Sequence, residues 1–156
     1  MNASQGNNPA QELAAALSEF ALLRKNKKAP GHRMARAVLV PLGEILLEGT
    51  TEGLDATLGE IARLTEDCSE EWAKAVDAEL RMAAEEHCAS VDPRYLEHPR
   101  YDFAYTVSAR ERLEARLRAI ELLGLLVPED LLDRVGKADE VLEPFLERAD
   151  RARRDG

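Results

Sequence analysis

The sequence predicts an all-α fold, a single-domain helical bundle of about six or seven helices. Leu and Ala supply most of the apolar residues, and both favour helices over strands. β-branched residues are few and scattered, which argues against a strand-rich fold. Apolar residues recur every three or four positions along most of the chain, the spacing that gives a helix one apolar face. At 156 residues the chain is long enough to bury a core as one domain without disulfides or metals.

The first helix is expected to begin at Pro9 and to end near Ala29. Asn8 directly before this proline, with Gln11 three residues further on, is typical of a capped helix start. The Pro-Gly pair that follows Ala29 breaks the helical pattern. The sequence therefore predicts a helix over residues 9–29.

The second helix is expected to be the central and most buried one. Its predicted apolar positions cover much of its circumference: Met34, Val38, Leu39, Leu42, Ile45, Leu46 and Leu47. Pro41 is expected to kink this helix or to split it, because proline lacks the N–H that an interior hydrogen bond needs. Gly49 is expected to end it.

A third helix is predicted to start at Thr50 or Thr51. A fourth is predicted to start within residues 67–70, which resemble a capping box, and to run to about Ser90. The apolar stripe expected on the fourth helix is formed by Trp72, Val76, Leu80 and Ala83.

A long irregular connection is expected near residues 91–106. It is followed by a fifth helix from Val107 or Ser108 to Gly124, a short sixth helix that Gly136 ends, and a seventh over about 141–149. The expected organisation is a disordered tail at 1–8, a helical domain at 9–149 and a charged tail at 150–156.

The net charge of the chain is −9, and its distribution is uneven. Residues 1–36 hold six Lys and Arg against two Glu, a net of +4, which leaves −13 on residues 37–156. The six cations form a basic stretch without an intervening acid: Arg24, Lys25, Lys27, Lys28, Arg33 and Arg36. This stretch is either a solvated helix end or a patch that docks a phosphate, a nucleic acid or an acidic partner. Nucleic acid is the less expected ligand, because no aromatic residue interleaves the cations. The charge asymmetry would also suit self-association.

The predicted connection is unusually rich in aromatic residues, since it holds all three tyrosines of the chain. A Pro-Arg-Tyr triplet occurs in it twice. The residues expected to bind a partner here are Arg94, Tyr95, Arg100, Tyr101, Phe103 and Tyr105. Tyr and Arg are common anchors of protein interfaces, so one interpretation is a recognition surface. The alternative is that the tyrosines pack over one end of the bundle.

The sequence contains none of the motifs that identify nucleotide-binding loops, nucleophile elbows or zincin metal sites. His87 is the candidate centre of a metal or thiol enzyme, because potential ligands lie near it in the sequence: Glu85, Glu86, Cys88, Asp92 and His98. The simpler interpretation places His87 on the apolar stripe as a core histidine. Cys68 is expected to be an unreactive thiol because its neighbours are acidic.

The expected function is therefore a non-catalytic protein–protein interaction or regulatory module, possessing neither catalytic residues nor a cofactor, and forming a homo-oligomer. Anion or nucleic-acid binding through residues 24–36 is the first alternative, and an enzyme built around His87 is the second. The first eight residues are polar, and no apolar run approaches the ~20 residues that span a bilayer, so a cytoplasmic protein that does not bind membranes is expected.

Overall fold

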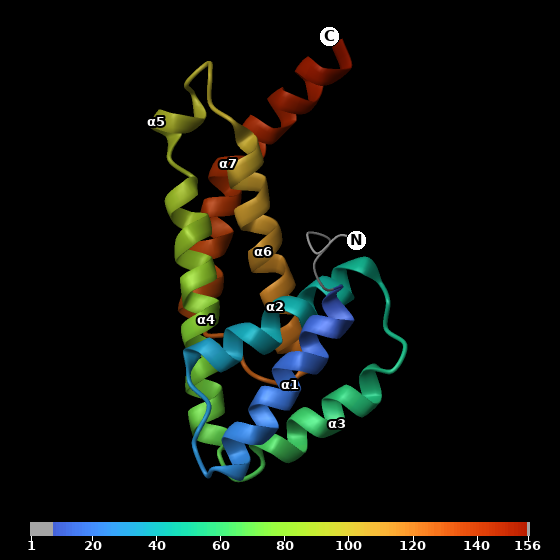
Figure 1. The fold of residues 1–156 in the computed structure, drawn as a ribbon. Helices are drawn as coiled ribbons and strands as arrows, with labels where there is room; N and C mark the ends of the chain where they lie inside the picture. The colour runs from blue at the N-terminus through green and yellow to red at the C-terminus, as the bar shows by residue number, and fades with distance from the viewer. Residues whose placement is uncertain (1–7, 156) are drawn as a thin grey trace. The chain divides into compact units, whose positions relative to one another are not determined.

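A computed structural model describes residues 8–155 of the chain (Figure 1), and this part forms seven α-helices and no β-strand. The predicted all-α helical bundle is confirmed. The expected disordered tail at 1–8 lies outside the described residues, apart from Asn8. Within the described range, no helix combines the length and the apolar character needed to cross a lipid bilayer.

The helices form two compact units, which are described separately. Of the described residues, the first unit comprises 8–80 and 114–126, and the second comprises 81–113 and 127–155. Two helices, α4 and α6, continue from one unit into the other, so each unit contains one part of either helix.

In the first unit, α1 (Pro9–Lys25) begins as the sequence predicts. Asn8 Oδ1 accepts the Gln11 backbone N–H at 2.9 Å, and Gln11 Oε1 accepts the Asn8 backbone N–H at 3.1 Å. This reciprocal pair is the predicted capping box. The helix ends before the predicted Ala29, and Lys27 beyond it adopts a left-handed backbone with φ of 58°.

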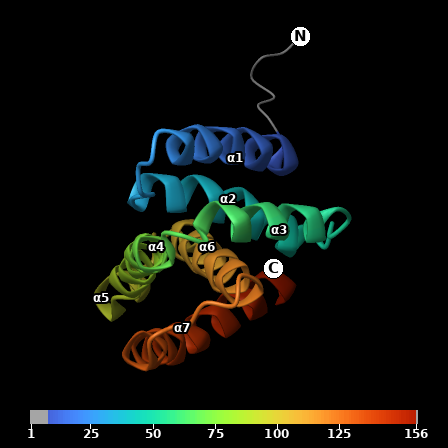
Figure 2. The same ribbon diagram turned by 90° about the horizontal axis from the view of Figure 1, so that it is seen from below.

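The next helix, α2 (His32–Glu48), lies beside α1 in both views (Figures 1 and 2). Pro41 does not split it, because the burial of its apolar face outweighs one lost hydrogen bond. Four of its side chains are fully buried: Ala35, Val38, Leu39 and Leu42. Leu47 is 42% exposed, so less of the circumference is covered than predicted. Gly49, with φ of 79°, ends the helix as predicted.

Close packing within the first unit joins α2 to α6 and α1 to α4. A Cβ built on Gly43 would lie 2.6 Å from the carbonyl oxygen of Ala115, so the backbones approach at a distance that only glycine permits. Phe20 is fully buried, and its ring centroid lies 5.3 Å from that of Trp72. These contacts fix the first two helices on the core.

The third helix, α3 (Leu54–Thr65), begins later than the prediction from Thr50 or Thr51. Gly53 precedes it with φ of 80°, a conformation that favours glycine and delays the helix start. The fourth helix, α4 (Ser69–Ser90), starts within the predicted capping segment.

In the second unit, the connection after α4 is more regular than expected. It contains a short helix, α5 (Pro93–Leu96), in which Leu96 is buried. Helix α6 (Phe103–Leu122) begins before the predicted Val107 or Ser108.

Asp102 explains the early start of α6. Its Oδ1 accepts the backbone N–H of Ala104 at 2.9 Å, which satisfies a donor at the helix end. The irregular backbone near 91–106 is therefore confined to short stretches on either side of α5. At the other end of α6, Gly124 has φ of 74° and stops the helix as predicted.

The last helix, α7 (Glu129–Asp155), replaces two predicted helices and most of the predicted tail at 150–156. Gly136 does not end it. Leu131, Val135 and Leu142 are buried at helical spacing across this glycine. Burial along one face therefore outweighs the roughly 1 kcal/mol that a glycine costs inside a helix.

Candidate functional site

The aromatic residues of the connection divide into exposed and inward-facing rings. Tyr95 and Tyr105 are 59% and 55% exposed. The Tyr101 hydroxyl lies 3.3 Å from the carbonyl oxygen of Ser90 and also hydrogen-bonds the Thr106 hydroxyl. Tyr101 therefore stabilises the fold through hydrogen bonds, while Tyr95 and Tyr105 expose their rings to solvent.

Phe103 packs against the ring of Tyr101. It meets Tyr101 edge to face, with the ring centroids 5.2 Å apart. The two Pro-Arg-Tyr triplets thus have different environments, because Tyr95 of the first is exposed and Tyr101 of the second packs against Phe103.

The two arginines of the connection also differ. The Arg94 guanidinium donates to Asp92 Oδ2 at 2.9 Å, and the Arg94 backbone N–H donates to the same carboxylate at 2.9 Å. These hydrogen bonds lower the pKa of Asp92 and raise the pKa of Arg94. Arg100 is exposed, and its backbone N–H donates to His98 Nδ1 at 3.1 Å. One of the two predicted binding cations is therefore already paired within the loop.

His87 occupies the core of the second unit. Its side chain is fully buried, and its Nε2 lies 2.8 Å from Asp139 Oδ1. Arg110 donates to the same carboxylate through Nε at 2.9 Å and Nη2 at 3.1 Å. The buried Nδ1 of His87 has no hydrogen-bond partner in the described part of the chain. A side chain with no solvent access cannot reach a substrate, so the arrangement fits a core histidine.

The two thiols are not arranged as nucleophiles. Burial raises the pKa of both Cys68 and Cys88, so each thiol is held in the protonated form. Cys68 Sγ also faces the carbonyl oxygen of Leu64 at 3.6 Å. Over the described residues, the His, Cys, Asp and Glu side chains form no group of three that could hold a metal ion.

The basic stretch has two kinds of cation. The Arg24 guanidinium pairs with Asp67 Oδ1 at 2.5 Å and donates to the carbonyl oxygen of Lys28 at 2.7 Å, so it holds the turn after α1 in place. The other five side chains are exposed: Lys25, Lys27, Lys28, Arg33 and Arg36. The sequence identifies the six cations, and the structure adds that Arg24 is committed to the fold.

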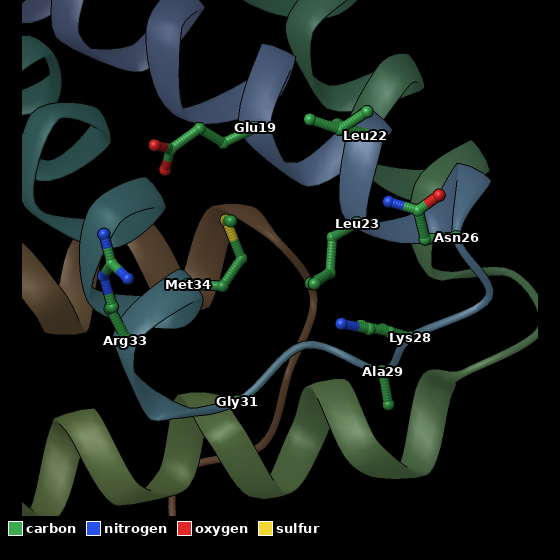
Figure 3. A pocket seen from close by; sticks show the side chains of 9 residues that line it. All are labelled: Glu19, Leu22, Leu23, Asn26, Lys28, Ala29, Gly31, Arg33 and Met34. Carbon is green, nitrogen blue, oxygen red and sulfur yellow. The ribbon is translucent and has the colours of Figure 1, made fainter.

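Two of the exposed cations line a cavity of about 370 Å³ at the corner between α1 and α2, which we name the corner pocket (Figure 3). Its apolar lining comes from Leu22, Leu23, Ala29 and Met34. Lys28 and Arg33 supply the positive charge, and Figure 3 shows the Lys28 side chain directed inward beside Leu23. The pocket therefore combines an apolar interior with cations.

The two cations of the corner pocket are available to a ligand. No hydrogen bond or ion pair with the described residues engages the side chain of Lys28 or of Arg33. Glu19 also lines the pocket, and in Figure 3 it lies on the same side as Arg33. The net charge of the three side chains is positive, so the pocket favours an anionic group next to an apolar one.

A polar cluster with a buried carboxylate lies at the start of α2, where Gly31 and Arg33 line the corner pocket. His32, the first residue of α2, places its Nε2 2.8 Å from Glu79 Oε1. The Glu79 side chain is fully buried, and its Oε2 accepts the Arg116 Nε–H at 3.0 Å. These bonds tie the start of α2 to α4 and so fix the position of Arg33, the next residue.

Sequence reasoning missed this cluster, although a signal was present. Glu79 falls between Val76 and Ala83 on the predicted apolar stripe of the fourth helix, where a carboxylate is out of place. A charged residue on a buried face requires partners, because burying an unpaired charge is costly. The identity of those partners depends on the tertiary structure and has no local signature.

Comparison with protein-family models, with curated proteins and with solved structures finds no match for this chain.

Proposed function

We propose that this chain is a non-catalytic protein-interaction module, and that its corner pocket holds an acidic, amphipathic segment of a partner protein. One observation carries the proposal. The side chains of Lys28 and Arg33, which no described residue engages, border an apolar cavity of about 370 Å³. Desolvated apolar anchors with nearby charges are the usual energetic centre of a protein interface.

The size of the pocket supports a side chain as the occupant. Its volume is near the lower end of the ~300–1,000 Å³ typical of small-molecule sites. Such a space admits one or two apolar side chains, while cations at the edge pair with carboxylates that remain partly hydrated. Charge complementarity of this kind contributes specificity and a fast association rate.

The composition of the lining argues against nucleic acid as the main ligand. The pocket is lined by aliphatic and polar side chains, which offer no ring on which a base could stack. The chain as a whole carries a net charge of −9, which repels an extended polyanion. A short acidic protein segment avoids this repulsion because its charge is local.

The connection offers a second surface for the same function. The exposure of Tyr95 and Tyr105 favours it, since large exposed rings are suited to interfaces. Arg94, however, would have to leave Asp92 to pair with a partner. The corner pocket requires no such exchange.

The proposal is tested with a short fluorescein-labelled peptide in which one central leucine is flanked by aspartates and glutamates. We expect saturable binding by fluorescence anisotropy, a weaker affinity for the same peptide with alanine in place of leucine, and further weakening at high salt. Lys28→Glu with Arg33→Glu should raise the Kd by about tenfold or more, a loss of about 1.4 kcal/mol per factor of ten.

The matched control is Lys25→Glu with Lys27→Glu, which makes the same change of charge in the same stretch but outside the pocket lining. This control should change the Kd by much less. Equal losses for the two double variants would mean that the peptide reads the general charge of the stretch. Equal binding of the leucine and alanine peptides would show that the cavity takes no side chain.

A further inference from the structure

We propose that the corner pocket receives Leu126 of a second copy of this chain, together with the acidic residues that follow it, so that copies associate head to tail. The proposal rests on the function proposed above and names the partner. It follows from the match between one exposed segment of the chain and the chemistry of its own pocket.

Leu126 is left in solvent by the fold. Its side chain is 96% exposed, the largest value among the exposed large hydrophobic residues in the described part of the chain. It lies within residues 125–128, between α6 and α7, where the backbone belongs to no helix. Connecting segments run over the surface of a protein, so an exposed side chain on this segment can enter a cavity of another molecule without unfolding a helix.

Acidic residues follow this leucine directly. Glu129 and Asp130 form the first turn of α7, and the Asp130 side chain remains 67% exposed although it lies 3.6 Å from Arg81. Residues 126 and 129 are at most about 11 Å apart along the backbone, given ~3.3–3.6 Å per extended residue. The segment therefore presents an apolar side chain and then carboxylates within the reach of long basic side chains.

The corner pocket offers side chains of complementary character. Leu23 and Met34 line its apolar interior, and Lys28 and Arg33 stand beside them without a described partner. The proposed contact buries Leu126 against the first pair and places Glu129 near the second. The uneven charge of the chain, +4 on residues 1–36 and −13 on the rest, favours the same orientation.

The proposed contact is heterologous, that is head to tail, because the pocket and Leu126 are different patches of the same chain. Such heterologous contacts build rings or open chains rather than a closed two-fold dimer. A contact made by one leucine and a few ion pairs is smaller than the ~1,200–2,000 Å² of a stable interface. The association is therefore reversible and depends on protein concentration.

Sedimentation velocity of the full-length protein, at concentrations rising from micromolar to millimolar, tests the proposal. We expect the average mass of the wild type to rise with concentration and to fall again when salt is added. Leu126→Ala and, separately, Lys28→Glu with Arg33→Glu should each weaken association by about tenfold or more. Leu47→Ala is the matched control, since Leu47 is also exposed, at 42%, but outside both surfaces, and it should behave as the wild type.

Mixing the two deficient variants gives the decisive result. Leu126→Ala keeps an intact pocket and the pocket variant keeps Leu126, so a mixture should form a heterodimer that neither protein forms alone. Denaturant melts of each variant establish that it is folded, and Glu129→Lys serves as a second segment variant with a milder expected loss. A wild type that stays monomeric throughout, or a mixture that stays monomeric, overturns the head-to-tail contact.

The outcome for the proposed function is separate. If the wild type is monomeric but binds the acidic leucine peptide through Lys28 and Arg33, the pocket is a site for another protein and the second copy is not its occupant. If neither association nor peptide binding depends on these two cations, both proposals fail.

Discussion

The corner pocket and the connection near residues 91–106 share a composition of basic and large apolar residues, but their side chains are engaged differently. At the corner, Lys28 and Arg33 have no partner among the described residues and stand around a cavity. In the connection, Arg94 is bound to Asp92, and Tyr101 is hydrogen-bonded within the fold. Composition marks both regions as candidate surfaces, and the pairing of their side chains distinguishes them.

A cluster of arginine, carboxylate and histidine occurs in each unit, and the two clusters differ in which member is buried. In the first unit, the Glu79 side chain is fully buried and the His32 side chain is 41% exposed. In the second unit, the His87 side chain is fully buried and Asp139 is 37% exposed. A buried carboxylate depends on its cationic partners, whereas a half-exposed carboxylate can be hydrated.

The largest expected effect comes from the buried carboxylate. Glu79→Ala removes the acceptor that faces the buried Arg116 and leaves His32 without its bond to α4. We expect a loss of about 3–5 kcal/mol in the free energy of unfolding, as is usual when one partner of a buried ion pair is deleted. Urea denaturation measures it, and a loss below about 1 kcal/mol would show that the cluster does not hold the start of α2.

A smaller effect is expected in the second cluster. Asp139→Ala takes the hydrogen-bond partner from His87 Nε2, a buried group, and costs about 1–3 kcal/mol. The carboxylate itself is partly hydrated, so its interaction with the Arg110 guanidinium adds little. If this substitution destabilises the protein as much as Glu79→Ala does in the same urea experiment, the contrast between the clusters is wrong.

Sequence reasoning predicted those parts of the fold that depend on neighbouring residues. The capping box at Asn8 and Gln11 and the helix ends at Gly49 and Gly124 have local signatures, and all are present. The continuity of α7 through Gly136 was missed because burial across the glycine depends on distant contacts.

The candidate site likewise has one part that is visible in the local sequence and another that depends on distant contacts. The sequence identified Lys28 and Arg33 as members of a basic stretch, since charge is visible residue by residue. The cavity beside them was not predictable, because it arises where α1 and α2 meet. The commitment of Arg24 to Asp67 was hidden for the same reason, since the partners are far apart in the chain.

Tyr101 tests whether the connection serves the fold. Tyr101→Phe keeps the ring contact with Phe103 but removes the hydroxyl that reaches Ser90 and Thr106. We expect a loss of about 0.5–1.5 kcal/mol, the usual net contribution of a hydrogen bond. Thermal unfolding followed by circular dichroism detects this change, and an unchanged melting temperature would assign Tyr101 to the free surface with Tyr95.

The smallest expected effect is a shift in the pKa of Asp92, in the same connection. The hydrogen bonds from Arg94 hold the pKa of Asp92 below its ordinary value. A carboxyl with a lowered pKa stabilises the fold above its unfolded pKa, and this contribution is lost as the pH falls through the folded pKa. In Arg94→Gln, the pKa of Asp92 measured by NMR should rise towards its ordinary value; an unchanged pKa would show that Arg94 is not bound to Asp92 in solution and is free for a partner.

One measurement addresses the central claim that the corner pocket, and not the connection, is the recognition surface. The Kd of the acidic leucine peptide is determined by anisotropy for two double variants that change the charge equally. Lys28→Glu with Arg33→Glu should weaken binding by about tenfold or more, and Arg94→Glu with Arg100→Glu should leave it within about twofold of the wild type. A large loss for the connection variant together with unchanged binding for the pocket variant would contradict the account and place recognition on the tyrosine-bearing connection.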